Sequence, residues 1–381
     1  MDPMVSIIIP VYNGANYMRE AIDSALAQTY SNIEIIVVND GSTDQTRDIA
    51  LSYGDKIRYF EKENGGVSTA LNLGIKNMRG KYFSWLSHDD IYLPEKVQIQ
   101  IDALRQAGDM SRVVYGGRAF LTMPERKIQE QHHHLTYRQS FLETGAIAAL
   151  FHLIAGCNLL IPKFYFDVYG GFDENLRCIQ DCKKWFDMFR GKRLIYIPEI
   201  LYFTRQHPDQ TGNTSPLMRI DDSWLNHWMI YNFHKDDLVG SGLTDLYHLY
   251  SAIFTRYIWT PYHDSPEYKF VVRKIADTPE SPDANERAQT LSELVNDRRF
   301  ITYLPKEDEY HLKIDFDLRA VTLGDNVKFL PFEQMMEIEP AENIRLLHRE
   351  LLLQALIDTP VRKEILFREF PKIRRQEHGH F

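Results

Sequence analysis

The sequence predicts an α/β fold built on a doubly wound, mostly parallel sheet, followed by a mainly α-helical C-terminal region. Three observations support this prediction. Short β-branched runs alternate with helical patterns over the first hundred residues, polar clusters follow those runs, and the character of the chain changes near residue 240. Right-handed crossovers would bring the ends of the strands, and therefore the polar clusters, to one edge of the sheet.

The first four strands and helices are expected in strict alternation. Strands are expected over 5–10, 33–39, 57–60 and 82–86, and helices over 14–29, 43–53, 67–78 and 94–106. The first two strand runs are rich in Val and Ile, as in strands buried on both faces. The helical runs carry apolar residues at the spacing of one helix face. Pro94 suits the first helical turn, where a backbone N–H would lack a partner in any case.

The next segment, up to about residue 238, is mixed. Further strands are expected over 113–115, 158–161 and 194–197, and a helix over 181–190. The apolar stretch 146–161 is shorter than the ~20 residues of a spanning helix and predicts a buried helix that runs into a buried strand. We place a domain boundary after residue 238, in a polar and glycine-containing stretch. Residues 239–381 then form the helical region, including an amphipathic helix over 340–370 interrupted at Pro360.

Composition and charge exclude several classes of protein. The 381 residues carry a formal net charge of −9, whereas proteins that bind nucleic acid polymers usually show a basic excess. Three cysteines do not make a disulfide framework, and the N-terminus has no basic segment typical of a signal peptide, so a reducing cytoplasmic setting is expected. Cys178 and Cys182 have no second cysteine pair to complete a zinc site. His132 to His134 are expected in a solvated loop.

The polar cluster Asp89-Asp90 predicts a metal-assisted nucleotide site. The turn after the first strand lacks the dinucleotide-binding glycine fingerprint, and the chain has no P-loop. A diphosphate at this edge would therefore need a cation, and carboxylate oxygens suit Mg²⁺ or Mn²⁺. The alternative is that both acids cap the following helix or face water.

Four successive segments resemble glycosyltransferase family 2 in their sequence, order and spacing. They are Val5-Ser6-Ile7-Ile8-Ile9-Pro10-Val11-Tyr12-Asn13, Ile36-Val37-Val38-Asn39-Asp40-Gly41-Ser42-Thr43-Asp44, Asn64-Gly65-Gly66-Val67-Ser68-Thr69-Ala70-Leu71-Asn72 and Trp85-Leu86-Ser87-His88-Asp89-Asp90. The resemblance covers about residues 4–210. It implies a GT-A fold, a nucleotide-diphosphate sugar donor that is most often a UDP-sugar, and inversion at the anomeric carbon. Residues 1–110 would form the donor half and 111–238 the acceptor half.

The resemblance also implies roles for individual residues on the donor side. Pro10 and Tyr12 would flank the base, and Asp40 would accept a hydrogen bond from it. Asp89 would be the main metal ligand, because Ser87 stands where the family usually has a first Asp. His88 fills the variable position and is expected to point away from the ion. The full expected donor-binding set is Pro10, Tyr12, Asn13, Asp40, Asn64, Ser68, His88, Asp89, Asp90 and Arg205.

Two downstream segments resemble the acceptor side and the closing segment of the family. In Gln180-Asp181-Cys182-Lys183-Lys184-Trp185, Asp181 matches the catalytic base, and Gln180 and Trp185 would lie on the acceptor side. An inverting displacement needs one carboxylate to take the proton of the acceptor hydroxyl. Asp181 could also cap its helix. In Tyr202-Phe203-Thr204-Arg205-Gln206-His207, His207 would complete the metal shell and Arg205 would face the diphosphate.

The function expected from these residues is metal-dependent transfer of a hexosyl or N-acetylhexosaminyl group to a bacterial glycan or lipid-linked glycan. Residues 239–381 would contact the acceptor, a second copy of the chain or a membrane surface. The basic and apolar run 362–377 suits the inner face of a membrane, or equally a packed helix end. The rival interpretations are a non-catalytic sugar-binding module and a nucleotidyltransferase. The latter would carry a basic, glycine-rich loop after the first strand, which this chain lacks.

Overall fold

The computed structural model describes residues 2–176, 178–208, 210, 225–226, 228–230, 232–243, 246, 249–250, 253, 312–315 and 320–323. The chain divides into two compact units, Met1–Gly242 and Leu243–Phe381. The division falls after Gly242, whereas the sequence places the boundary after residue 238.

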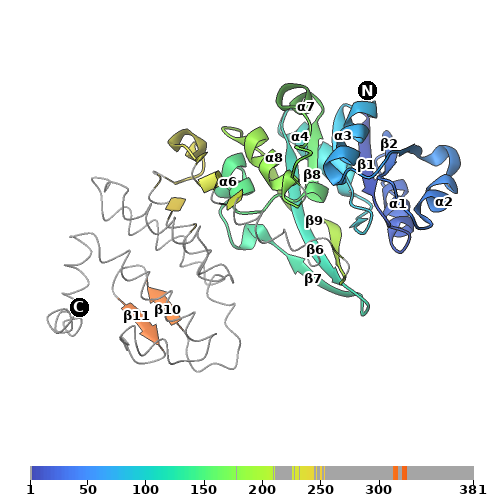
Figure 1. Ribbon diagram of the computed structural model, residues 1–381. Helices are drawn as coiled ribbons and strands as arrows, with labels where there is room; N and C mark the ends of the chain where they lie inside the picture. Colours follow the sequence, from blue (N-terminus) through green and yellow to red (C-terminus); the bar gives the residue numbers. More distant parts are fainter. Residues whose placement is uncertain are drawn as a thin grey trace. The chain divides into compact units, whose positions relative to one another are not determined.

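A nine-stranded sheet runs through the first unit (Figure 1). Its strands are β1 (Val5–Val11), β2 (Ile33–Asn39), β3 (Arg58–Glu61), β4 (Tyr82–Trp85), β5 (Ile91–Tyr92), β6 (Val114–Thr122), β7 (Lys127–Gln131), β8 (Leu159–Pro162) and β9 (Ile195–Gln206). The helices are α1 (Met18–Leu26), α2 (Thr46–Leu51), α3 (Val67–Asn77), α4 (Lys96–Gln106), α5 (Gln139–Leu142), α6 (Gly145–Leu150), α7 (Phe164–Tyr169) and α8 (Gln180–Phe189). Short 3-10 helices are η1 (Gly54–Lys56), η2 (His133–Leu135), η3 (Gly156–Asn158) and η4 (Lys235–Leu238).

The strand order is β3-β2-β1-β4-β8-β6-β9-β5, with β7 paired to β6. The four strands β3, β2, β1 and β4 are parallel, as the sequence predicts. The rest of the sheet is mixed, because β8 lies antiparallel between β4 and β6. The chain enters β8 from η3, where Gly156 backs onto the Trp85 ring so closely that a Cβ would lie 2.2 Å from it. The chain therefore enters β8 beside the carboxyl end of β4 and must run back along it.

The strand β9 is three times longer than the sequence predicts, with 12 residues. Pro198 and Glu199 interrupt its apolar pattern, and the β6–β9 ladder shifts register around Gly117. Irregular pairing of this kind is typical of a bulge, which lets a strand continue past residues that do not fit the ladder. The extension matters for function, because it carries the chain to Arg205 and His207.

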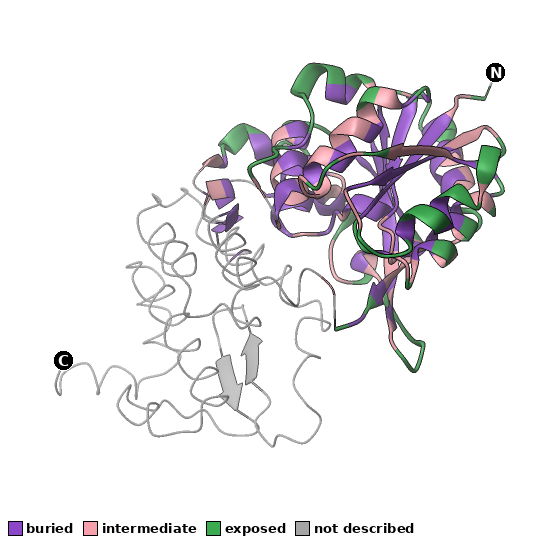
Figure 2. Ribbon diagram, turned by 45° about the vertical axis from the view of Figure 1, so that its right-hand side comes forward, coloured by how far each residue is buried: buried purple, intermediate pink, exposed green. Residues whose placement is uncertain are grey.

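Burial is highest in the strands that the sequence identifies as apolar (Figure 2). All seven residues of β1 are buried. The stretch 146–161 forms the buried α6, η3 and β8, in line with expectation. No helix of the described part of the chain is long and apolar enough to cross a membrane. The histidine segment differs from expectation, because η2 buries His133 and burial lowers the pKa of His133 to about 4.

Most of the second unit lies outside the described residues. This includes the predicted helix over 340–370 and the run 362–377 that suits a membrane surface. Within the unit, β10 (Leu312–Asp315) and β11 (Ala320–Leu323) form an antiparallel pair in which Leu312 lies opposite Leu323. The sequence does not predict this pair.

Candidate active site

The loops after β1 and β2 are tied together by Asn13. Its backbone N–H donates to Ser42 Oγ at 2.9 Å, and its side-chain Oδ1 accepts from the N–H of Thr43 at 2.8 Å. Asp44 accepts from the N–H groups of Ala15 and Thr46. Asn13, with a φ of 48°, therefore holds two loops in register through its backbone N–H and its Oδ1.

Tyr12 and Pro10 differ in exposure. Tyr12 is 48% exposed, so its ring is available to a flat ligand such as a base. Pro10 is buried inside β1 and forms the floor below this loop. Of the two residues expected to flank the base, only Tyr12 can be contacted over a large area.

Asp40 is the anchor of the loop that precedes α3. It is 3% exposed, and its Oδ1 lies 2.7 Å from Lys62 Nζ and 3.0 Å from the N–H of Gly65. Its Oδ2 accepts from the N–H of Gly66 at 2.7 Å. A carboxylate oxygen has about two acceptor sites, so Oδ2 keeps one for a further donor such as a base. Asp40 thus positions the loop whether or not it also contacts the nucleotide.

We expect Lys62→Met to lower the free energy of unfolding by about 2 kcal/mol, because it leaves the buried Asp40 carboxylate without its cation. A fully buried pair would lose more, but a quarter of the Lys62 side chain is exposed. Urea unfolding of the variant measures the loss, with Lys76→Met, which removes an exposed lysine, as the control. A loss no larger than that of the control would contradict a stabilising role for the pair.

Asp89 and His207 meet at the end of β4, although 118 positions separate them. His207 Nε2 lies 3.1 Å from Asp89 Oδ2, and His207 is 8% exposed. The pairing follows from register, because β5 and β9 are antiparallel with Ile91 opposite Phe203. Extending that register by two residues puts Asp89 beside Arg205, so the residues just beyond Arg205 reach the loop.

The donor set of this pair fits a divalent cation. A carboxylate oxygen and a neutral imidazole nitrogen together suit Mn²⁺, and the carboxylate alone suits Mg²⁺. Within the part of the chain that the structure describes, no group of three or more His, Cys, Asp or Glu side chains could hold a metal ion. Oxygen atoms of a diphosphate and water would have to supply the remaining ligands.

Arg205 differs from its expected role at the diphosphate. The side chain has no exposed surface. Its Nε donates to the Asp89 carbonyl at 2.7 Å, its Nη2 lies 3.2 Å from Glu20 Oε2, and its Cζ lies 4.4 Å from the Tyr17 ring centroid. The guanidinium therefore lies inward in this structure, where it holds the backbone of the Asp89 loop.

Asp90 and His88 also face inward. Asp90 Oδ1 accepts from the N–H of Arg205 at 3.0 Å, and Asp90 is 6% exposed. Burial and the neighbouring Asp89 charge raise the pKa of Asp90. His88 packs so closely on Gly14 that a Cβ there would lie 2.5 Å from the imidazole, and burial lowers the pKa of His88. Both residues order the loop, and Asp90 presents little surface to a donor.

The remaining donor-side residues, Asn64 and Ser68, differ in exposure. Asn64, a member of the expected donor-binding set, is exposed. Ser68 is 2% exposed, with its Oγ 3.5 Å from the carbonyl of Leu176, so it links α3 to the segment before α8 instead of facing a ribose.

On the acceptor side, Asp181 lies in the first turn of α8 and is half-buried. Burial raises the pKa of Asp181 above its ordinary value. The N-cap residue is Ile179, so Asp181 lies inside the first turn, where its carboxylate accepts hydrogen bonds from backbone N–H groups of that turn. Trp185 is fully buried, stacked on Phe189 with ring centroids 5.7 Å apart, and Gln180 is 6% exposed. Both side chains therefore lie in the protein interior, and their contacts with an acceptor stay a prediction.

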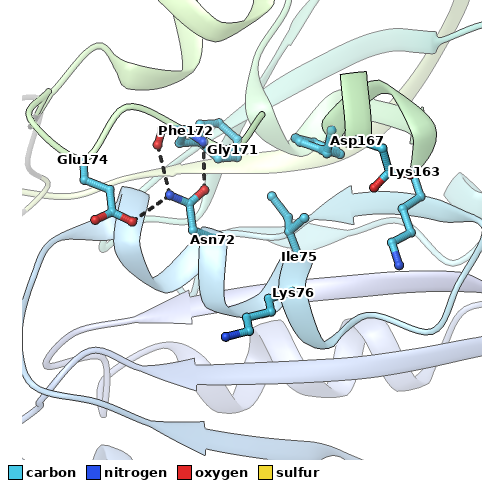
Figure 3. Close-up of a pocket in the computed structure, with 9 residues that line it drawn as sticks. Asn72, Ile75, Lys76, Lys163, Asp167, Gly171, Phe172 and Glu174 are labelled. Atoms are coloured by element: carbon cyan, nitrogen blue, oxygen red, sulfur yellow. Dashed lines mark hydrogen bonds between the residues drawn. The ribbon is translucent and has the colours of Figure 1, made fainter. Parts of the chain in front are cut away.

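A pocket of about 440 Å³ lies between α3, α7 and the loop that leads to α8 (Figure 3). Asn72 holds that loop, because its Nδ2 donates to the Phe172 carbonyl at 3.0 Å and its Oδ1 accepts from the Phe172 N–H at 2.7 Å. Gly171 is required beside it, since a Cβ would lie 2.3 Å from Asn72 Oδ1. Asn72 belongs to a segment that resembles the family, but its reach across 100 positions has no local signal in the sequence.

Comparison with known proteins identifies the family. The model of glycosyl transferase family 2 matches residues 6–170. An uncharacterized glycosyltransferase of Rickettsia prowazekii is 52% identical over 225 residues, which cover 58% of this chain and 71% of that protein. The chain belongs to glycosyltransferase family 2. The uncharacterized glycosyltransferase EpsJ of Bacillus subtilis is 31% identical over 278 residues. That match covers 62% of this chain and 74% of EpsJ.

Among solved structures, S. aureus TarS 1–349 has a similar fold. The TM-score is 0.51 at 15% sequence identity, and the match covers 92% of this chain and 91% of that one. The family resemblance of the sequence and its α/β fold are thus confirmed. As a family 2 glycosyltransferase, the chain is an enzyme, which sets aside the non-catalytic module and the nucleotidyltransferase.

Proposed function

We propose that this glycosyltransferase moves a sugar from a nucleotide-diphosphate donor, with UDP-sugars as the first candidates, to a hydroxyl of a glycan or lipid-linked acceptor. The observation that carries the proposal is the Asp89–His207 pair, 3.1 Å apart at the carboxyl end of β4. In open α/β sheets this edge is where ligands bind. The exposed Tyr12 ring at the end of β1 offers a face for the base at the same edge.

The proposed reaction is a single in-line displacement with inversion. Asp181 takes the proton of the acceptor hydroxyl as its oxygen bonds to the anomeric carbon and the bond to the diphosphate breaks. When bound, Mn²⁺ or Mg²⁺ neutralises the negative charge of the leaving diphosphate. Asp89 and His207 would hold that ion, and Arg205 would keep the Asp89 loop in place.

We expect a nucleotide-diphosphate sugar to raise the melting temperature of the protein only when a divalent cation is present. A ligand at about a hundred times its Kd adds ~2.7 kcal/mol to stability, which corresponds to a rise of roughly 5 °C. A thermal-shift screen of UDP-, GDP- and TDP-sugars, first with Mn²⁺ and then with EDTA, identifies the nucleobase of the donor. ATP with Mn²⁺ is the control. Failure of every nucleotide-diphosphate sugar to stabilise the protein beyond ATP would contradict the proposed donor class.

A further inference from the structure

Three side chains beside Asp181, the proposed catalytic base, form a chain of polar contacts of the kind that activates a thiol. Cys182 Sγ lies 3.6 Å from His152 Nδ1, and His152 Nε2 lies 3.1 Å from Asn226 Oδ1. Cys182 comes from the first turn of α8, and His152 follows the end of α6. Cysteine, imidazole and amide thus come from three separate segments, and Cys182 is the residue next to Asp181.

The contact with Asn226 bears on which nitrogen of the His152 imidazole carries the hydrogen. The Asn226 Oδ1 atom can only accept, so it favours the tautomer with the hydrogen on His152 Nε2. In that tautomer Nδ1 is the acceptor that faces the thiol. A base held in this orientation can take the thiol proton, and the thiolate is the nucleophilic form of cysteine. The amide N–H groups at the start of the ten-residue helix α8 also favour a negative charge on Cys182.

The backbone of His152 supports a specific role. Its φ is 52°, a left-handed conformation that is uncommon for residues other than glycine. Such conformations persist where the surrounding structure enforces them, and they cluster at functional sites.

The other two cysteines provide internal comparisons. Cys178 is half-buried like Cys182, whereas Cys157 is buried and burial raises the pKa of its thiol. One neighbour opposes the thiolate. The Asp181 carboxylate accepts hydrogen bonds from the Cys182 backbone and thiol, so it competes with His152 for the thiol hydrogen and would repel an anion there. Removing that charge should make Cys182 more reactive.

We propose that Cys182 is a reactive thiol that exchanges with small disulfides, and that the resulting adduct blocks the adjacent Asp181. His152 takes the proton of Cys182, the thiolate attacks one sulfur of the disulfide, a new S–S bond forms and the old one breaks. The proton then passes from His152 to the thiolate that leaves. The blocking step rests on the proposed function of Asp181, whereas the reactivity does not.

Reactivity is tested on the full chain with dithiodipyridine at neutral pH, and mass spectrometry gives the rate at each cysteine. We expect Cys182 to react about tenfold or more faster than Cys178. His152→Gln should reduce the rate at Cys182 to that at Cys178, Asn226→Ala should slow it in part, and Asp181→Asn should accelerate it. The rate at Cys178 in each variant reports whether the fold is retained. Equal rates at Cys178 and Cys182, or an unchanged rate in His152→Gln, would overturn the proposal.

The blocking step has its own measurement. Sugar transfer by the wild-type chain should fall in proportion to the fraction of Cys182 modified and return after reduction with dithiothreitol. The activity of Cys182→Ser should not change on treatment. Rapid modification with full transfer would overturn the blocking step. An absence of transfer with any donor before treatment would instead count against the proposed function, because the rate of modification does not depend on turnover.

Discussion

Asp181→Asn is expected to lower kcat by about a thousandfold while leaving the fold intact. General-base catalysis by a positioned carboxylate contributes roughly 10²–10⁴ in rate, and asparagine cannot take a proton from the acceptor hydroxyl. The fold should persist, because asparagine has nearly the same shape and removes a carboxylate whose charge is disfavoured by burial. At neutral pH the free energy of unfolding should therefore stay the same or rise. Steady-state transfer assays and urea unfolding measure the two effects.

Asp187→Asn is the matched control for this variant. Asp187 lies on the same helix, where it pairs with Lys183 at 2.7 Å on the surface, so its loss should change kcat little. The wild-type pH profile provides a second check. Since burial raises the pKa of Asp181, activity should fall on acidification at a higher pH than an ordinary aspartate would give. An Asp181→Asn enzyme that keeps more than about a tenth of wild-type kcat would contradict the assignment of Asp181 as base.

Asp89→Asn is expected to lower transfer by about a hundredfold or more at a fixed Mn²⁺ concentration. A metal ion that neutralises a leaving diphosphate contributes several kcal/mol to the transition state, and each 1.4 kcal/mol is a factor of about ten. The variant keeps an oxygen ligand but loses its charge, so added Mn²⁺ should restore part of the activity. His207→Gln should raise the Mn²⁺ concentration for half-maximal activity with a smaller loss in rate. Titrations of Mn²⁺ in transfer assays give both values.

Ser87→Ala is the control from the same loop. Ser87 stands at the position where the family usually has an acid, and its Oγ lies 3.4 Å from Cys157 Sγ. If Ser87 orders the loop without binding the ion, its loss should leave the Mn²⁺ requirement unchanged. The metal assignment would be wrong if Asp89→Asn and Ser87→Ala needed the same Mn²⁺ concentration.

The parallel part of the sheet could be predicted because its signals are local. The β1 run from Val5 to Val11 is buried along its whole length, and a continuous apolar run is typical of such a strand. The antiparallel β8 and the long β9 were harder to predict, since no residue within β8 records its direction. The chain reaches β8 from η3, where Gly156 packs on Trp85, and that contact spans 71 positions. Contacts between distant segments of this kind are not visible in local periodicity.

In the site, too, local signals could be recognised in the sequence, whereas contacts between distant segments could not. Asp89 could be identified because its strand and the polar cluster are adjacent in sequence. Arg205 was predicted to face the diphosphate, but its guanidinium is buried against Tyr17 and Glu20. A motif gives the type of residue at a position, whereas exposure depends on tertiary neighbours. The Lys62 partner of Asp40 and the role of Asn72 depend on such neighbours in the same way.

The central claim is that Asp89 holds a cation that binds the donor diphosphate. Isothermal titration of UDP into the wild-type chain and into Asp89→Asn, each with Mn²⁺ and with EDTA, tests that claim most directly. If the thermal-shift screen selects another base, the corresponding nucleoside diphosphate replaces UDP. We expect Mn²⁺ to strengthen binding by tenfold or more in the wild type and to have little effect in the variant. Binding that is equally strong with EDTA, or a Mn²⁺ effect that persists in Asp89→Asn, would contradict the claim.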